Sequence, residues 1–216
     1  MAVKALRATC LCGSAKHELT IPASGLPLNL TLCHCNSCRH MTGTLRLTVA
    51  VLPKSYSPSS RLVSTLKSYK FSKRITDYSC PECGTHMLFH VKHGEETPNS
   101  NGYWAVHTGT LVRVDEILDV DVHWFVADTL DGGFSDFLPT IRGNTIPRYA
   151  GFKRKSSQLP LGWRSPERPQ ITPSPSDKLH CRCKYGGVEF WIARPSDRSS
   201  KVLGASASMS TFIYLY

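Results

Sequence analysis

Seven cysteines in the first half of the chain have the spacing of metal ligands. They form three short clusters: Cys-x-Cys-Gly at positions 10–13, Cys-His-Cys-x-x-Cys-Arg at 33–39 and Cys-x-x-Cys-Gly at 80–84. Thiolates at such spacings bind zinc, and two closed tetrahedral sites would need eight of them. Seven sulfurs instead predict one four-thiolate site and one three-thiolate site with a free coordination position.

The four-thiolate site is predicted to contain Cys10, Cys12, Cys80 and Cys83. Each pair is followed by a glycine, which lets backbone N–H groups turn toward the sulfurs. The two halves are separated by about 70 residues, so an ion held between them would clamp distant strands together. A simple zinc ribbon has a gap nearer ~15–20 residues and fits less well. The alternatives are buried thiols without a metal, or a disulfide.

The three-thiolate site is predicted to contain Cys33, Cys35 and Cys38. Cys35 and Cys38 can share one face of a short helical turn, whose N–H groups and dipole favour thiolates. His34 and His40 are candidates for a fourth ligand. His34 lies between two ligands and is expected to point away, and an exposed or ligand-supporting role is favoured for both histidines. The alternative is a metal-free site, or one closed by another ligand.

The elements that must position these cysteines read as β-strands. Leu45, Leu47, Val49 and Val51 alternate with less apolar residues, which is the period of a half-buried strand. A helical turn is expected near residues 36–41, and the sequence contains no long amphipathic helix. We therefore predict a mainly β fold of short antiparallel sheets with little helix. Further β-prone stretches are 16–20, 28–33, 74–79, 87–91, 103–108 and 122–126.

Composition and charge narrow the class of protein. The chain has 216 residues, 41% of them hydrophobic, which suits one globular domain. It has no apolar run of the ~18 residues that a membrane helix needs, and no apolar stretch of signal-peptide length at its start. Nine cysteines, an odd number, favour metal binding over complete disulfide pairing. These features predict a cytoplasmic protein without a membrane segment.

The net charge of +10 is concentrated at the end of the chain. Residues 1–150 carry 15 Lys and Arg against 12 Asp and Glu, whereas residues 151–216 carry 11 against 4. The basic run Lys153-Arg154-Lys155 is interpreted as part of a solvated linker, so nucleic-acid binding is not expected.

The second half of the chain changes composition twice. Residues 151–177 are rich in Pro, Ser and basic residues, which is typical of a linker. Cys181-Arg182-Cys183 then repeats the Cys10-Leu11-Cys12 pattern, with an apolar and acidic stretch after it. The predicted organisation is a zinc-binding domain at 1–150, a linker at 151–177 and the beginning of a truncated second repeat at 178–216.

The complete set of motifs resembles the glutathione-dependent formaldehyde-activating (GFA) family, also called the centromere protein V family. The family pattern is C-x-C-G, C-H-C-x-x-C-R with a Gly shortly after, C-x-x-C-G-T and a terminal His-aromatic strand. The resemblance covers about residues 1–150. It departs from the family pattern just before the third cluster, where the family favours Phe or another aromatic residue and this chain has Tyr78-Ser79. The matching residues are Cys10, Cys12, Gly13, Cys33, His34, Cys35, Cys38, Arg39, Gly43, Cys80, Cys83, Gly84, Thr85 and His123 to Phe125.

The resemblance implies a β-tent fold with two zinc ions per chain. It implies a structural zinc on the four-cysteine set and a catalytic zinc on Cys33, Cys35 and Cys38. The implied activity is that of a carbon–sulfur lyase, which forms or cleaves S-hydroxymethylglutathione from glutathione and formaldehyde. A non-catalytic zinc-stabilised module, such as a thiol carrier or a chromatin or cytoskeletal partner, is the alternative.

The residues that would complete a catalytic site are not fixed by the sequence. Arg39 is a candidate for binding a substrate carboxylate, and a salt bridge is an equal alternative. Five histidines are candidates for proton transfer, and nothing in the sequence chooses among them. They are His34, His40, His86, His90 and His107.

Overall fold

The computed structural model of the chain describes residues 2–92, 102–112, 117–166, 178–183 and 186–193. Within these ranges the protein is mainly β, with two short α-helices and several 3-10 turns between the strands. The predicted fold class, mainly β with little helix, is confirmed. Among the described residues, no helix combines the length and the apolar character needed to cross a membrane.

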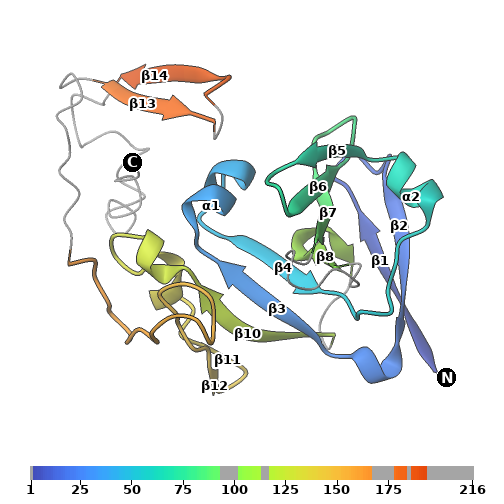
Figure 1. The fold of residues 1–216 in the computed structure, drawn as a ribbon, viewed down its shortest axis with the longest axis horizontal. Coiled ribbons are helices and arrows are strands. Elements are labelled where there is room, and N and C mark those ends of the chain that lie inside the picture. The colour runs from blue at the N-terminus through green and yellow to red at the C-terminus, as the bar shows by residue number, and fades with distance from the viewer. Residues whose placement is uncertain (1, 93–101, 113–116, 167–177, 184–185, 194–216) are drawn as a thin grey trace.

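A seven-stranded sheet forms the centre of the protein (Figure 1). Its strand order from edge to edge is β10-β3-β4-β8-β7-β6-β5. Neighbouring strands run antiparallel except at one edge, where β10 pairs with β3 in parallel. In the order of the sheet, the strands span Leu118–Trp124, Leu28–Cys33, Leu47–Val51, Tyr103–His107, His86–Val91, Ile75–Ser79 and Lys67–Lys70.

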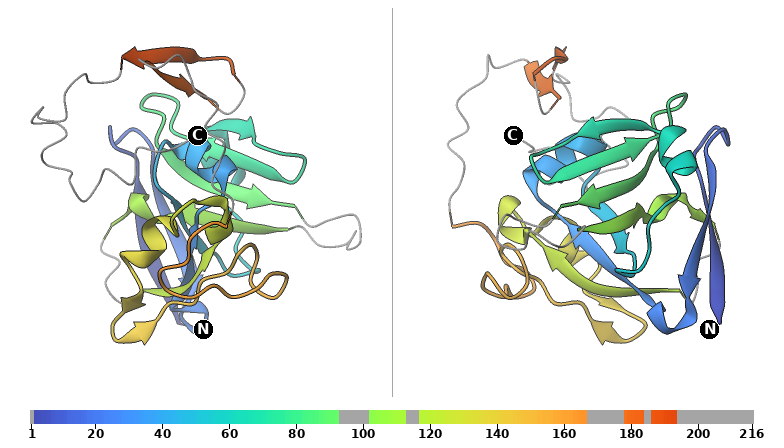
Figure 2. Two further views of the ribbon diagram at one scale, coloured as in Figure 1. Left: turned by 90° about the vertical axis from the view of Figure 1, so that its left-hand side faces the viewer. Right: turned by 45° about the vertical axis from the view of Figure 1, so that its right-hand side comes forward.

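A smaller sheet packs beside the first. It contains β2 (Lys16–Pro22), β1 (Val3–Thr9) and β9 (Leu111–Val112) in that order, all antiparallel. Figure 2 shows from two further directions that β1 and β2 form a layer of their own next to the larger sheet. The strict alternation of buried and exposed residues along β2 is that of a strand covered on one face.

The short helices lie at strand ends. The predicted helical turn is present as α1 (Asn36–Thr42), which ends at Gly43 in the left-handed conformation. A second helix, α2 (Ser60–Ser64), begins after Ser59, whose side chain accepts a hydrogen bond from the Leu62 amide. The remaining elements are η1 (Ala23–Gly25), η2 (Thr108–Thr110), η3 (Val126–Asp128), η4 (Gly133–Asp136), β11 (Thr140–Ile141) and β12 (Asn144–Thr145).

The two faces of the central sheet bury separate apolar clusters. Neighbouring residues of β4, Val49 and Ala50, belong to different clusters because successive side chains of a strand point to opposite faces. The cluster that contains Ala50 lies between the two sheets and includes Leu6, Leu19 and other residues of β1 and β2. The cluster that contains Val49 lies on the face that carries α1. The cysteine groups divide between these two faces.

Residues 151–166, the described part of the predicted linker, contact the preceding segment. The Phe152 ring lies 5.3 Å from Trp124 and 4.7 Å from Phe125, measured between ring centroids. The Arg164 guanidinium donates to the Asp136 carboxylate at 2.8 Å. These contacts tie residues 151–166 to β10 and η4, and the domain boundary at residue 150 remains a prediction. Residues 167–177 lie outside the described residues.

The predicted repeat begins with a hairpin of β13 (Lys178–Arg182) and β14 (Glu189–Ala193). At its turn, the amide of Cys183 donates to the Val188 carbonyl at 2.9 Å. The amide of Gly186 donates to the Cys183 carbonyl at 3.1 Å. The rest of the predicted repeat, residues 194–216, lies outside the described residues.

The turn of the first hairpin has the same two hydrogen bonds. Cys10 donates to the Ala15 carbonyl at 2.9 Å, and Gly13 donates to the Cys10 carbonyl at 3.1 Å. Cys183 thus occupies the place of Cys10, although the sequence pattern alone aligns Cys181 with Cys10. Cys181 lies further back, on β13. The two turns therefore correspond with an offset two residues larger than the one that aligns the cysteine pairs, and the second repeat remains a prediction.

Candidate metal centres and active site

The structure brings together the four cysteines predicted to share one site. Cys10 and Cys12 come from the turn between β1 and β2, and Cys80 and Cys83 from the turn between β6 and β7. Their four sulfur atoms all lie within 4.8 Å of one another. The Sγ atoms of Cys12 and Cys80 are 3.8 Å apart although 68 residues separate them in the chain. The two sheets therefore meet at this group.

Two hydroxyl groups complete the surroundings of the four sulfurs. The Ser14 Oγ lies 3.0 Å from the Sγ of Cys12 and 3.1 Å from that of Cys80. The Thr85 Oγ1 lies 3.1 Å from the Sγ of Cys83 and accepts a hydrogen bond from the Leu11 amide. Each hydroxyl belongs to one turn, and each reaches an atom of the opposite turn.

Hydrogen bonds to these sulfurs favour the thiolate form that a metal ion needs. Burial raises the pKa of Cys10, but bonds from the Ala15 amide and from Cys12 and Ser14 outweigh it and lower the value to about 7. The hydroxyl and amide of Thr85 lower the pKa of Cys83 to about 5. A set of four converging, partly ionised thiols fits a tetrahedral zinc ion.

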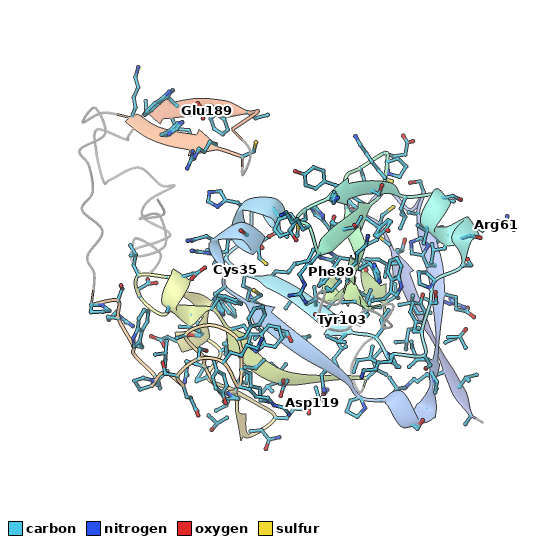
Figure 3. All side chains as sticks on the ribbon, viewed as in Figure 1. Cys35, Arg61, Phe89, Tyr103, Asp119 and Glu189 are labelled. Carbon is cyan, nitrogen blue, oxygen red and sulfur yellow. The ribbon has the colours of Figure 1, made fainter. Side chains whose placement is uncertain are left out.

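The three cysteines of the second cluster also converge. Cys33 ends β3, Cys35 is the N-cap of α1, and Cys38 lies in the first turn of that helix. The Cys35 Sγ accepts a hydrogen bond from the Cys38 amide at 3.3 Å. The three sulfurs lie within 4.8 Å of one another, and no further Cys, His, Asp or Glu of the described residues joins them. Figure 3 marks Cys35 at the start of α1.

The three sulfurs of this group share negative charge unequally. Hydrogen bonds from Cys33 and Cys38 lower the pKa of Cys35 to about 3. The neighbouring Cys35 thiolate raises the pKa of Cys33 to about 12, and Cys33 and Cys35 together raise the pKa of Cys38. The negative charge of the group is therefore favoured on Cys35. A divalent cation would stabilise all three as thiolates, so the donor set fits a zinc ion as well.

His34 is fully buried and points away from the three sulfurs, as the sequence predicts. Its Nε2 lies 3.0 Å from the Nδ1 of His123, whose Nε2 lies 3.0 Å from the Leu138 carbonyl. Since a carbonyl only accepts, His123 donates from Nε2, and His34 donates to the free Nδ1 of His123. Burial lowers the pKa of His34 to about 3 and that of His123 to about 4, so both rings are neutral. The pair anchors the end of β3.

Arg39 is part of the scaffold of this site. Its side chain is 8% exposed, and its Nη2 donates to the Asn36 side chain at 2.6 Å and to the Asp128 carbonyl at 2.8 Å. The Asp128 carboxylate in turn accepts from the Asn36 amide. Arg39 thus joins α1 to η3, which leaves its guanidinium badly placed for a substrate carboxylate.

The structure also shows a polar group of three residues, of which the sequence predicted two as candidates for a catalytic role. Asp77, His86 and His107 have donor atoms within 4.8 Å of one another. His86 and His107 are among the predicted proton-transfer candidates, but Asp77 is not. The other two histidine candidates lie outside this group. The His40 Nδ1 lies 2.9 Å from the Asn36 carbonyl, and the His90 ring is tilted against that of Trp104, with 4.7 Å between the ring centroids. No spacing motif links Asp77 to the two histidines, so the sequence contains no signal that would predict the cluster.

Fold and site define a small, mainly β protein with two cysteine groups, each of which could hold a metal ion. The profile of the family described as glutathione-dependent formaldehyde-activating enzyme matches residues 5–128. That segment is more than half of the chain and contains all seven clustered cysteines. The chain belongs to this family, as its motifs predict.

Two curated relatives carry the same description in their names. They come from Aspergillus flavus and Aspergillus oryzae, and each is 28% identical to this chain over 83 residues. The matched segment is 38% of this chain and 42% of each relative. The chain thus matches less than half the length of these relatives, and the activity of the whole proteins enters here only as a proposal.

Proposed function

We propose that this protein catalyses the reversible addition of a glutathione-like thiol to formaldehyde, at a zinc site formed by Cys33, Cys35 and Cys38. In the forward direction a carbon–sulfur bond forms between the thiol sulfur and the carbonyl carbon. The proton of the thiol goes to the carbonyl oxygen, which becomes the hydroxyl of S-hydroxymethylglutathione. The reverse reaction is that of a carbon–sulfur lyase.

The observation that carries the proposal is the unequal number of sulfurs in the two groups. Four sulfurs saturate a tetrahedral ion, whereas three leave one position open. When bound in the open group, zinc would supply a positive charge that favours the thiolate form of an incoming thiol. The four-cysteine group is proposed to hold a structural zinc, so the chain would bind two ions.

The protein around the three sulfurs supports access from one side. Cys33 is buried, but Cys35 and Cys38 are half-buried, so solvent reaches the group from the side of α1. Val49, Phe89 and other buried residues of the sheet belong to the same cluster and keep water from its inner side. The chain's own contribution is thus to fix three sulfurs at the end of a strand and to shield them on the sheet side.

The test is an exchange experiment by NMR with formaldehyde, glutathione and the zinc-loaded protein. We expect interconversion of formaldehyde and S-hydroxymethylglutathione faster than the spontaneous reaction, and we expect Cys35→Ser to return the rate to the spontaneous value. Repeating the experiment with N-acetylcysteine, whose blocked nitrogen prevents ring closure with formaldehyde, measures the preference for glutathione. A wild-type rate equal to the spontaneous rate at full zinc loading would refute catalysis and favour a zinc-stabilised binding module.

A further inference from the structure

A third group of metal-binding side chains lies on the same sheet face as the three-cysteine site. Asp77 belongs to β6, His86 to β7 and His107 to the end of β8. The Asp77 Oδ2 lies 2.6 Å from the His86 Nδ1, and its Oδ1 lies 2.9 Å from the His107 Nε2. The Asp77 and His107 side chains are 3% and 8% exposed, and that of His86 is 32% exposed. The cluster is therefore buried on two sides and open at His86.

A β-bulge brings His86 onto this face. Asp77 is opposite Phe89 in the β6–β7 pair, and opposed residues of neighbouring strands share a face. Strict alternation would put His86 on the opposite face from Phe89, because His86 lies three positions earlier in the strand and an odd difference reverses the face. The register shifts by one residue between Tyr78 and Ser79, so that Ser79 pairs with His86. The extra residue in β7 turns the His86 ring toward Asp77. Bulges beside functional sites commonly reorient a side chain in this way.

The contacts of His86 leave its Nδ1 facing the Asp77 carboxylate. The ring also bonds to the backbone of Met41 in α1, and the carbonyl there can only accept. Nδ1 faces Asp77, so Nε2 carries the hydrogen that Met41 accepts. In a neutral imidazole the Nδ1 lone pair would then face a carboxylate oxygen at 2.6 Å. Two acceptors at this distance repel each other unless a proton or a metal ion lies between them.

We propose that Asp77, His86 and His107 form a binding site for a divalent first-row transition metal ion, separate from both cysteine groups. Two imidazoles and one carboxylate are the donor set of mononuclear sites that keep open coordination positions. The donor atoms of the three side chains all lie within 4.8 Å of one another, so the three side chains converge on a space of the size that one metal ion with bonds of ~2.1 Å occupies. Imidazole donors disfavour Mg²⁺ and Ca²⁺, which prefer oxygen ligands.

The surroundings of His86 match those of a metal ligand. A ligating histidine characteristically donates its second N–H to a carbonyl or carboxylate, which fixes the ring and its tautomer. Met41 supplies that carbonyl, and it lies three residues after Cys38 on α1. Helix α1 thus contacts both groups.

The test uses the zinc-loaded protein and cobalt(II) as the probe. We expect equilibrium dialysis at neutral pH to show about one further equivalent of cobalt per chain, with the zinc content unchanged. The cobalt spectrum should contain weak visible bands and lack the intense near-ultraviolet bands of cobalt–thiolate bonds. Such thiolate bands would instead report exchange into the cysteine groups, and a cobalt uptake explained entirely by them would overturn the proposal.

Variants separate this site from nonspecific uptake. His86→Ala and Asp77→Asn should each lose the additional cobalt while they keep the zinc of the cysteine groups. His90→Ala, a histidine change on the same strand, should retain it and serves as the matched control. Folding is checked by zinc content and circular dichroism, so a variant that unfolds is recognised and replaced by His107→Gln. Cobalt uptake that is unchanged in folded Asp77→Asn and His86→Ala, or absent in the wild type, would show that only a proton bridges Asp77 and His86.

Discussion

The two cysteine groups lie on opposite faces of one sheet and are built in opposite ways. Cys10 and Cys80 belong to the cluster between the sheets, whereas Cys33 belongs to the cluster beneath α1. The four-cysteine group takes its sulfurs from two distant turns and adds a hydroxyl from each. The three-cysteine group takes all its sulfurs from one strand end and the helix that follows.

We infer that this difference decides whether an ion bound at a group stabilises the fold or remains able to bind an outside donor. Sulfurs from distant turns link parts of the chain, so an ion bound there stabilises the fold as a whole. Sulfurs from one short segment link almost nothing, so an ion bound there contributes less to the fold and remains available to an outside donor. On the proposed function, the number of residues that a cysteine site spans decides whether its ion stabilises the fold or stays open to an outside donor.

The largest effect is expected for Cys83→Ser. Loss of one sulfur opens the four-cysteine group, and the contribution of a structural metal ion is comparable to the whole stability of a small domain. We expect loss of the cooperative unfolding transition, measured by circular dichroism during heating, and loss of bound zinc. The matched control is Cys183→Ser, because Cys183 holds the equivalent turn of the β13–β14 hairpin outside any group of donors found in the described residues.

The control sharpens the comparison. Cys183→Ser should leave the zinc content unchanged, since Cys183 belongs to none of the donor groups of the described residues. If Cys83→Ser melted like the wild type, the four-cysteine group would have no clamping role.

A smaller effect on the fold is expected for Cys35→Ser. This change should lower the zinc content by about one ion per chain and shift the melting temperature by less than roughly 5 °C. It removes the sulfur that caps α1 and carries the negative charge of the group, so binding at this site fails while the clamp persists. Metal analysis and thermal melting of one preparation test this, and Ser37→Ala in the same helix is the control. Collapse of the fold in Cys35→Ser would mean that both groups are structural.

The smallest effect is expected for Ser14→Ala. The Ser14 hydroxyl lowers the pKa of Cys10 and acts in the same direction on Cys12, so its loss raises both values. Protons then compete with the metal ion up to higher pH, and the midpoint for zinc release should rise by less than about one pH unit. Zinc release followed with a chromogenic chelator during acid titration measures the shift. Thr9→Ala is the control, because the Thr9 hydroxyl bonds to a carbonyl and not to a sulfur; an equal midpoint in Ser14→Ala and the wild type would contradict the role of the hydroxyl.

The sequence predicted the membership of the cysteine groups well because short spacings constrain geometry directly. Cys35 and Cys38 must share a helical turn once α1 forms, and the glycines after Cys12 and Cys83 allow their tight turns. The strand at 28–33 is found with the predicted bounds for the same reason: its alternation is local.

Features that depend on partners far along the chain were missed. The parallel pairing of β10 with β3 is one of them, since alternation encodes which face is buried and not which neighbour a strand chooses. Strand β1 was not predicted, and it is held in place by β2 and β9 on its two sides. The cluster around Asp77 also escaped detection because a register shift, which no motif announces, places His86 on its face.

The shared turn of the two hairpins has a consequence for the order of assembly. Gly13 and Gly186 both adopt positive φ, at 76° and 69°, and each donates to the carbonyl of the cysteine three residues earlier. Because Cys183 and Gly186 make these bonds with a cysteine at only the first of the two ligand positions, a complete ligand pair is not required for them. We therefore expect the β1–β2 loop to be shaped during synthesis, with metal capture following once the β6–β7 loop has emerged.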